Sequence, residues 1–242
     1  LKQPVIEWAN LYFPRNPNDL PLAYLVGITP IVNVQALYGG DLSVEGGRAD
    51  LFDGTDVLVV PDTKCPSEAI ALAEDVIRLI GGKSRFMDPV EHDGLIAATE
   101  LLPSLVGASL FYALQQSEGW MELRRMVNPT LALATQNLRY QTPQDLHALF
   151  TQNRDNLLRH LEALIGVLDQ AHDILLVANP EVDELEAFLS SVAKTWEQWD
   201  IKRYSGNWEA REAPELLPGP FGFGRGFLSL SRRKKDEDDE DK

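Results

Sequence analysis

Short apolar runs and helical periodicities divide this chain into an α/β part and a helical part. In the α/β part, the pattern predicts buried strands at residues 22–28, 57–60 and 84–87. A helix is predicted over residues 66–80, because apolar side chains recur on one face and because Pro66 and Gly81 suit its two ends. A strand, a helix and a strand of these lengths predict a right-handed parallel crossover. A sheet of two or three strands is rarely stable as an independent domain, so we expect further strands from another part of the protein.

The helical part begins near residue 90. Residues 90–102 predict a helix, with Asp88 placed to cap it and Pro89 ahead of its first turn. Pro103 should bend or interrupt this helix before its apolar face continues. A further helix is expected over 126–138.

A long helix is predicted from Thr142 onward. Thr142 suits its cap, Pro143 suits its first position, and apolar side chains keep a near-heptad rhythm as far as Leu175. At ~1.5 Å per residue this helix would be roughly 50 Å long, which is more than one small domain covers. A partner subunit is the simplest way to bury its apolar stripe. We therefore expect a homodimer.

Two candidate polar positions lie at the ends of predicted elements. Thr29 follows the first predicted strand, and ligands of open α/β sheets bind at the carboxyl ends of strands. His92 and Asp93 lie in the first turn of the helix over 90–102, where exposed N–H groups and the helix dipole favour a carboxylate. A His-Asp pair at a helix start is more often a capped surface turn than a catalytic dyad. The local pattern leaves both interpretations open.

The helical pattern ends near residue 200. Residues 201–242 contain a Pro- and Gly-rich stretch, a basic block and an acidic block, and this composition predicts a disordered charged tail. Glycines at 222, 224 and 226 superficially resemble a nucleotide-binding loop. No strand precedes them and no helix follows them in the predicted pattern, which argues against that function.

Composition limits the classes of function. The chain has 242 residues, is 44% hydrophobic and carries a net charge of -15, which disfavours nucleic acid and anionic membranes as partners. We expect a cytoplasmic protein, since no apolar run approaches the ~18–20 residues of a membrane span and the first residues resemble no signal peptide. Cys65 is the only cysteine and the four histidines are scattered, so neither a disulfide nor a metal site is expected.

Several motifs, in order, resemble those of the prephenate dehydrogenase family from Leu1 to about Leu176. The family's motifs are the end of a serine-valine-lysine segment, a glycine-glycine-histidine-proline-methionine motif, a leucine-phenylalanine-x-glycine turn, a His-Asp pair and a Ser-His-Leu-Pro-His segment. The similar stretches here are Leu1-Lys2-Gln3-Pro4, Gly27-Ile28-Thr29-Pro30-Ile31, Leu51-Phe52-Asp53-Gly54, His92-Asp93 and Glu100-Leu101-Leu102-Pro103-Ser104.

The resemblance implies a fold and a cofactor. Family members combine an N-terminal Rossmann domain, which binds NAD or NADP, with a C-terminal helical domain that dimerises. The expected fold class here is an α/β remnant of a Rossmann-type domain over 1–88, followed by an all-α dimerisation domain over 89–200. The family's Gly-rich dinucleotide fingerprint would precede Leu1, so we expect either a fragment or a chain that has lost the cofactor domain.

The resemblance also implies a site. The family histidine that accepts the hydroxyl proton falls on Thr29, beside the matched pair His92 and Asp93, and these three are the candidate catalytic residues. The two histidines of the Ser-His-Leu-Pro-His segment fall on Leu101 and Ser104.

The substrate-binding arginine of the family falls, by counting back from Thr142, on Asn137, with Arg139 as a replacement. Ser104, Asn137 and Arg139 are therefore the candidate substrate contacts. The resemblance implies that charge and proton transfer are missing at most family positions, because an alkyl hydroxyl does not titrate near neutral pH.

Two functions follow from this resemblance. The first is an NAD- or NADP-dependent prephenate or arogenate dehydrogenase-like oxidoreductase of tyrosine biosynthesis, whose reaction this chain alone would not catalyse. The second is a non-catalytic dimeric module, descended from such an enzyme, that binds a small ligand or a partner. The sequence upstream of Leu1 would discriminate them, because a strand followed by a GxGxxG motif would favour the enzyme.

Overall fold

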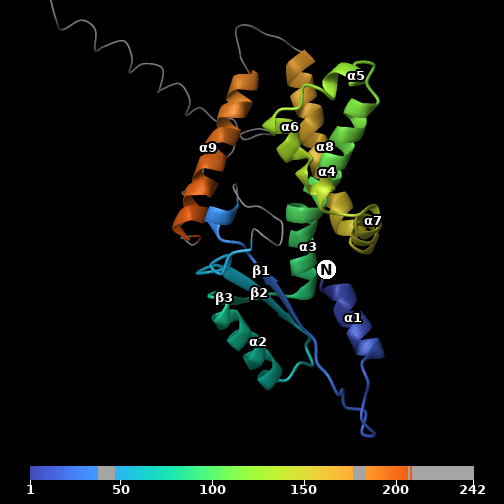
Figure 1. Cartoon of the computed structure of the whole chain (residues 1–242), viewed down its shortest axis with the longest axis vertical. Coiled ribbons are helices and arrows are strands. Elements are labelled where there is room, and N and C mark those ends of the chain that lie inside the picture. Colours follow the sequence, from blue (N-terminus) through green and yellow to red (C-terminus); the bar gives the residue numbers. More distant parts are fainter. Residues whose placement is uncertain (38–46, 177–183, 207, 209–242) are drawn as a thin grey trace, which may run out of the picture. The chain divides into compact units, whose positions relative to one another are not determined.

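The computed structural model describes residues 1–37, 47–176, 184–206 and 208. The chain divides into two compact units, Leu1–Val167 and Leu168–Lys242. The first unit holds the small sheet and the helices from α1 to most of α8, and the second holds α9 (Figure 1). The domain boundaries expected near residues 88 and 200 stay predictions.

A three-stranded sheet forms the base of the first unit. Its order is β1 (Val26–Pro30), β2 (Asp56–Pro61) and β3 (Lys83–Phe86), with β1 antiparallel and β3 parallel to the central β2. The helix α2 (Ser67–Leu79) connects β2 to β3, which confirms the predicted parallel strand, helix and strand.

The first strand begins later than predicted. Residues 22–25 lie outside β1, and the backbone N–H of Leu22 donates instead to the carbonyl of Pro14. Leu22 and Tyr24 are exposed, so this part of the apolar run belongs to the turn that returns from α1 (Gln3–Tyr12). Apolar composition marked the segment but could not show which residues find a partner strand.

The sheet is covered on both faces. The buried side chains of Val57 and Val59 pack with Ile77 of α2, and Val26 and Ile80 pack against this cluster. Figure 1 shows α2 on one side of the sheet and α1 and α3 (Pro89–Ile96) on the other. Both faces of β2 are therefore buried, as its continuous apolar run predicted.

Residues 89–115 form one helical stretch with a wider turn inside it. The π-helical turn η3 (Ala97–Leu101) joins α3 to α4 (Leu102–Gln115). Pro103 has no N–H to donate, and its ring would clash with the carbonyl four residues earlier in a regular α-helix. The π turn directly before Pro103 relieves that clash, so the proline interrupts the hydrogen-bond pattern without ending the helix.

The stretch Pro89–Gln115 also corrects an expectation about membranes. Among the described residues this stretch is the single helix that is long enough and apolar enough to cross a membrane by length and composition alone, so the expectation that no segment could qualify as a span is wrong. Its alanine, valine and leucine content raises the mean hydropathy, although the stretch contains no long uninterrupted apolar run. One such helix is weak evidence, because core helices of soluble proteins pass the same test. Its buried His92, Asp93 and Ser104 make hydrogen bonds inside the protein.

Two of the remaining predicted helices are divided into shorter pieces, whereas the last one extends further than predicted. The helix expected over 126–138 is two short pieces, and the long helix expected from Thr142 ends at Asn153, whose backbone leaves the helical region (φ -123, ψ 30). The last helix extends to Ser205, into the segment predicted to be disordered, and most of that segment lies outside the described residues. These elements are α5 (Trp120–Leu123), α6 (Pro129–Ala134), η4 (Gln136–Arg139), α7 (Pro143–Gln152), α8 (Arg154–Leu176) and α9 (Glu184–Ser205).

Candidate active site

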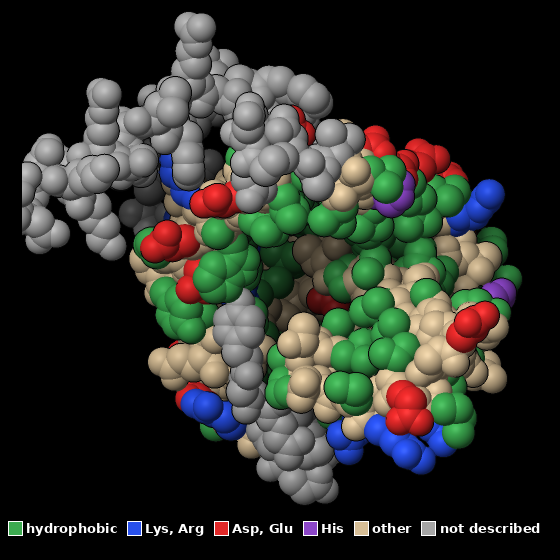
Figure 2. Space-filling model, turned by 90° about the horizontal axis from the view of Figure 1, so that it is seen from above, with side chains coloured by type: hydrophobic (Ala, Val, Ile, Leu, Met, Phe, Trp, Pro, Cys, Tyr) green, Lys and Arg blue, Asp and Glu red, His purple; other side chains and the backbone are tan. Residues whose placement is uncertain are grey.

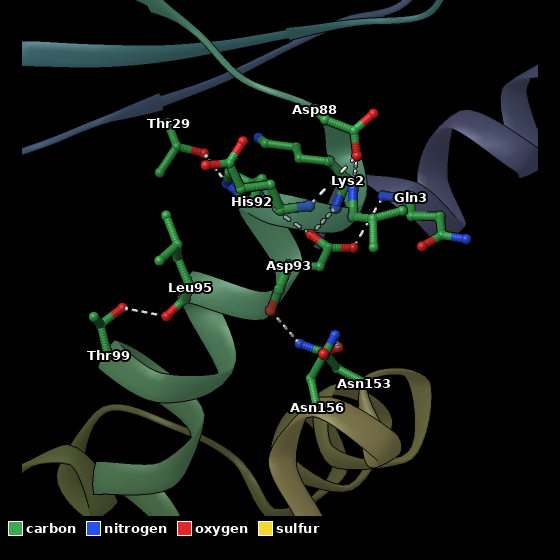
Figure 3. A network of polar contacts seen from close by, with 12 residues as sticks. Lys2, Gln3, Thr29, Asp88, His92, Asp93, Leu95, Thr99, Asn153 and Asn156 are labelled. Carbon is green, nitrogen blue, oxygen red and sulfur yellow. Dashed lines mark hydrogen bonds and ion pairs between the residues drawn. The ribbon is translucent and has the colours of Figure 1, made fainter. Parts of the chain in front are cut away.

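Three predicted catalytic residues form one hydrogen-bonded series, which we call the relay. The Thr29 hydroxyl lies 2.9 Å from Nε2 of His92, and Nδ1 of the same imidazole lies 2.8 Å from Oδ1 of Asp93. Thr29 comes from the end of β1, whereas His92 and Asp93 come from the first turns of α3 (Figure 3). His92 is 1% exposed and Asp93 is 4% exposed, so the pair is not a surface turn.

The start of α3 fixes the orientation of the His-Asp pair. The Asp88 carboxylate accepts the backbone N–H of Val90 at 2.8 Å, as the capping pattern predicted. Because Asp88 serves as the cap, the Asp93 carboxylate is left to bind groups from another element. The predicted helix start is therefore confirmed, but the acid that caps it is not the acid of the pair.

The Asp93 carboxylate satisfies the start of α1. Oδ1 accepts the backbone N–H of Lys2 at 2.7 Å, and Oδ2 accepts that of Gln3 at 3.0 Å. The first N–H groups of a helix have no partner within it and favour a negative charge, and the N-cap residue Lys2 has no side-chain cap of its own. Asp93 thus holds α1 and His92 with one side chain.

A buried asparagine anchors α3 from the opposite side. The Asn153 side-chain amide donates to the Asp93 carbonyl at 2.7 Å, and its carbonyl accepts from the Asn156 amide at 2.8 Å. Asn153 is 6% exposed and lies at the junction of α7 and α8. The sequence interpretation missed it, although an asparagine among heptad-spaced leucines was a signal of a local break.

The partners of His92 determine its tautomer. An ionised carboxylate can only accept, so Nδ1 carries the proton that faces Asp93. In the neutral imidazole, Nε2 is then free to accept the hydrogen bond of the Thr29 hydroxyl. Burial lowers the pKa of His92, a shift opposed by the Asp93 hydrogen bond and charge and reinforced by the Lys2 charge and the amino group of Leu1. The site therefore presents a neutral imidazole behind a threonine hydroxyl, an arrangement that can accept a proton.

The predicted substrate contacts lie in a second polar cluster on α4. Ser104 is buried, and its hydroxyl donates to Oε1 of Gln141 at 3.1 Å. One turn further along, a Cβ on Gly107 would lie 2.7 Å from the backbone oxygen of Ala134 and 3.0 Å from Oδ1 of Asn137, so the glycine lets the end of α6 and η4 approach α4 this closely. Among the residues that the structure describes, the Asn137 amide nitrogen is buried and has no hydrogen-bond acceptor.

Arg139 is not brought into this second cluster. The side chain is exposed, and its guanidinium lies 5.8 Å from the centre of the Tyr140 ring. Ser104 follows His92 by twelve residues of helix, which separates the two clusters by roughly 18 Å along the axis. Within the described ranges, no group of three His, Cys, Asp or Glu side chains could hold a metal ion. A small pocket lies elsewhere, between α1, the segment that follows it and the turn after β2.

Comparison with known proteins identifies the family that the chain resembles. Residues 88–191 match the model of the prephenate dehydrogenase dimerization domain. Over these residues the chain is similar to the prephenate dehydrogenases. A cyclohexadienyl dehydrogenase from Zymomonas mobilis is 35% identical over 66 residues, which are 27% of this chain and 22% of that protein.

Solved structures of prephenate dehydrogenase relatives share the fold. The arogenate dehydrogenase of Synechocystis matches with a TM-score of 0.56 at 20% identity, over 74% of this chain and 62% of that one. The prephenate dehydrogenase of A. aeolicus, in complex with hydroxyphenyl propionate and NAD+, matches with a TM-score of 0.57 at 22% identity, over 71% of this chain and 58% of that one. The chain thus spans less than two thirds of the length of these relatives.

The similarity to prephenate dehydrogenases confirms the resemblance predicted from the motifs, and it confirms the fold in outline as a small sheet followed by helices. The matched residues 88–191 include His92, Asp93, Ser104, Asn137 and Arg139.

Acidification should destabilise this protein through His92. The unfolded histidine binds a proton near pH ~6.5, whereas the folded one, with its pKa lowered mainly by burial, binds it only at lower pH. The unfolded state then binds more protons, so the free energy of unfolding should be at its full value above pH ~6.5 and fall as the pH drops below it. Urea unfolding at several pH values measures this dependence.

The matched variants for the pH series are His92→Gln and His147→Gln, since His147 is exposed. Removal of His92 should flatten the dependence of stability on pH below ~6.5. The His147 variant should keep the slope of the unmodified protein. Equal slopes in all three proteins would contradict a buried neutral imidazole.

Proposed function

We propose that this chain is the C-terminal part of an NAD- or NADP-dependent dehydrogenase that oxidises prephenate or arogenate, a cytoplasmic enzyme of tyrosine biosynthesis. The observation that carries the proposal is the 2.9 Å contact between the Thr29 hydroxyl and the buried His92 imidazole. It supplies a proton acceptor at the position where the sequence showed only a threonine. The resemblance to prephenate and arogenate dehydrogenases supports the reaction class.

The relay provides an acceptor for the O–H proton that the proposed reaction releases. A hydroxyl group that gives up a hydride from its carbon must also release its O–H proton. In our proposal the Thr29 oxygen takes this proton while its own proton passes to Nε2 of His92. The Asp93 carboxylate, 2.8 Å from Nδ1, then stabilises the imidazolium that forms. Thr29 is partly accessible, whereas His92 and Asp93 are buried, so the hydroxyl is the member of the relay that meets the substrate.

The described residues do not fit a dinucleotide cofactor. A pyrophosphate needs a glycine-rich turn between a strand and a helix N-terminus. The turn between β2 and α2 is Asp62-Thr63-Lys64-Cys65-Pro66, which contains no glycine and carries an acidic side chain. NAD or NADP, which would accept the hydride, is thus assigned to other parts of the enzyme. No step of the proposed relay depends on its geometry.

The second cluster supplies the proposed substrate contacts. The Ser104 hydroxyl bonds Gln141 and the Asn137 side chain lies against Gly107, three residues after Ser104; among the described residues the Asn137 amide nitrogen has no hydrogen-bond acceptor. A ligand carbonyl or carboxylate would satisfy its N–H donors. Arg139 remains a candidate from the exposed side of η4. Ser104 lies roughly 18 Å along the helical stretch from His92, so the second cluster would contact parts of a ligand remote from the reacting hydroxyl.

Cofactor reduction by the protein tests the function. The enzyme should be prepared with whatever segment its gene encodes before Leu1, and supplied with prephenate or arogenate and with NAD+ or NADP+. Absorbance of the reduced nicotinamide should rise with at least one of the four pairs, and the chain from Leu1 to Lys242 alone should be inactive. Turnover at background with all four pairs would contradict the enzyme and favour a non-catalytic module.

We also propose that the helical part forms a homodimer. Large hydrophobic side chains remain exposed on α4, α5 and the segments around them, and hydrophobic side chains are spread over the face seen in Figure 2. These residues include Leu110, Phe111, Tyr112, Met121, Met126 and Leu133. The matched family domain is named for dimerization.

Light scattering on the purified chain should give about twice the chain mass, because an isologous interface would bury these side chains. A substitution of Met126 by Glu should shift the particle toward the monomer. The matched control is Leu79→Glu, which changes an exposed leucine on α2, outside the helical part. A monomer for the unmodified chain at ~100 μM would contradict the dimer.

A further inference from the structure

Lys2 is fixed against the relay at three points. Its backbone N–H donates to Oδ1 of Asp93 at 2.7 Å, and its ammonium Nζ donates to the carbonyl of Ile28 at 2.8 Å. Between these ends, the side-chain methylenes cross Gly27, where an added Cβ would lie only 2.8 Å from Cδ of Lys2. A half-buried lysine held at both ends has lost most of the freedom that an exposed lysine keeps.

The ammonium of Lys2 lies at the reactive end of the relay. Ile28, which accepts its hydrogen bond, is the residue directly before Thr29 on β1. Figure 3 shows the Lys2 side chain extending toward the side of the site where Thr29 meets His92. This position agrees with the pKa shifts of the neighbouring groups. The Lys2 charge contributes to the lowered pKa of His92. Burial lowers the pKa of Lys2, and the Asp93 charge opposes that shift.

The same ammonium has unused hydrogen-bonding capacity. An ammonium group has three N–H donors. Within the part of the chain that the structure describes, the Ile28 carbonyl is its sole acceptor, and no carboxylate lies within the 4.0 Å of an ion pair. Burial lowers the pKa of Lys2, the response expected of a cation that lacks a close counter-ion. An anion beside Thr29 would provide that counter-ion.

We propose that Lys2 is the anion-binding residue of the Thr29 site, and that this site takes ligands which carry a hydroxyl group and present a negatively charged oxygen to Lys2. The oxygen is either a carboxylate or the oxyanion that forms as the hydroxyl loses its proton. This inference rests on the proposed function for the identity of the reacting hydroxyl. It assigns the charge that positions the ligand to the first helix, α1, instead of to the arginine position expected near residue 137.

Nuclear magnetic resonance on the chain from Leu1 to Lys242 tests the assignment without any turnover. Hydroxyphenyl propionate is the probe, since it carries both a hydroxyl and a carboxylate. Its addition should shift the signals of Lys2, Thr29 and His92 together. Lys2→Met should weaken the binding by roughly tenfold or more, because it removes a charge-assisted hydrogen bond. Lys2→Arg, which keeps the charge, should bind within about threefold of the unmodified chain.

Control molecules and a control residue separate the sources of the effect. Phenylpropionate lacks the hydroxyl, and 4-ethylphenol lacks the carboxylate. A Lys2→Met loss seen with phenylpropionate assigns the contact to a carboxylate, whereas a loss seen with 4-ethylphenol assigns it to the hydroxyl oxygen. Lys64→Met, which changes an exposed lysine in the turn after β2, should leave the affinity unchanged.

Two results would overturn the role of Lys2. One is an affinity of Lys2→Met within twofold of the unmodified chain. The other is a probe that leaves the Lys2 and Thr29 signals unmoved up to ~20 mM. Failure of the proposed function would give a different result. The protein would then show no turnover, but its binding of the probe could still depend on Lys2. Conversely, turnover that is unaffected by Lys2→Met would exclude the proposed role of Lys2 and would still support the dehydrogenase function.

Discussion

Replacing Asp93 by alanine should lower the free energy of unfolding by about 3–5 kcal/mol. The Asp93 carboxylate accepts from the backbone of Lys2, from the backbone of Gln3 and from Nδ1 of His92. Its removal leaves three part-buried or buried donors unpaired, each of which costs roughly 1–3 kcal/mol, with some of the loss recovered by water. The start of α1 and the orientation of His92 would be lost together.

Urea unfolding of the matched variants measures this effect. Asp88→Ala is the control, because Asp88 lies on the same helix but is exposed and serves only as its cap. It should cost about 1 kcal/mol. Asp93→Asn keeps the shape and one acceptor, so its cost should lie between the two. A loss for Asp93→Ala no larger than that for Asp88→Ala would show that the carboxylate does not hold α1 to α3.

Replacing Thr29 by valine should lower kcat of the assembled enzyme by roughly 10²–10⁴-fold, the usual contribution of a positioned acid or base. Valine keeps the branched shape and removes only the hydroxyl that contacts Nε2 of His92. His92→Gln should have a similar effect. Thr29→Ser, which restores a hydroxyl, should recover most of the activity. Initial rates of nicotinamide reduction measure all of these variants.

The double variant makes the test specific to the relay. If Thr29 and His92 pass one proton, the combined substitution should be about as slow as the worse single one, because members of a unit are not additive. Thr99→Val is the control, since this threonine lies on η3 and its hydroxyl contacts only the Leu95 carbonyl. Multiplicative effects in the double variant, or normal activity of Thr29→Val, would exclude the relay.

Local patterns predicted the elements whose partners are also local. The buried strand over Val57 to Val60 and the helix that follows it are where the apolar runs placed them, because burial of both faces dictates their composition. The cap at Asp88 was equally readable, since its partner Val90 is two residues away. The motifs around Thr29 and His92 gave the family.

Long-range contacts account for what the sequence could not show. The predicted helix beyond Thr142 breaks at Asn153 because that side chain bonds the Asp93 carbonyl sixty residues away. From the sequence alone Thr29 has no group with which to exchange a proton. The imidazole that contacts its hydroxyl comes from a different element, and only the fold brings the two together. Lys2 was visible only as part of a motif. Its role depends on the path of its side chain over Gly27.

The protonation of His92 tests the central claim most directly. Nitrogen-15 resonances of the imidazole report which nitrogen carries the proton and at what pH the ring becomes charged. We predict a neutral ring at pH 7 with the proton on Nδ1, facing Asp93, and with Nε2 unprotonated toward Thr29. Its titration should occur below pH 6.5, the ordinary value, because burial lowers its pKa. A proton on Nε2, or titration at or above the ordinary pH, would contradict the relay.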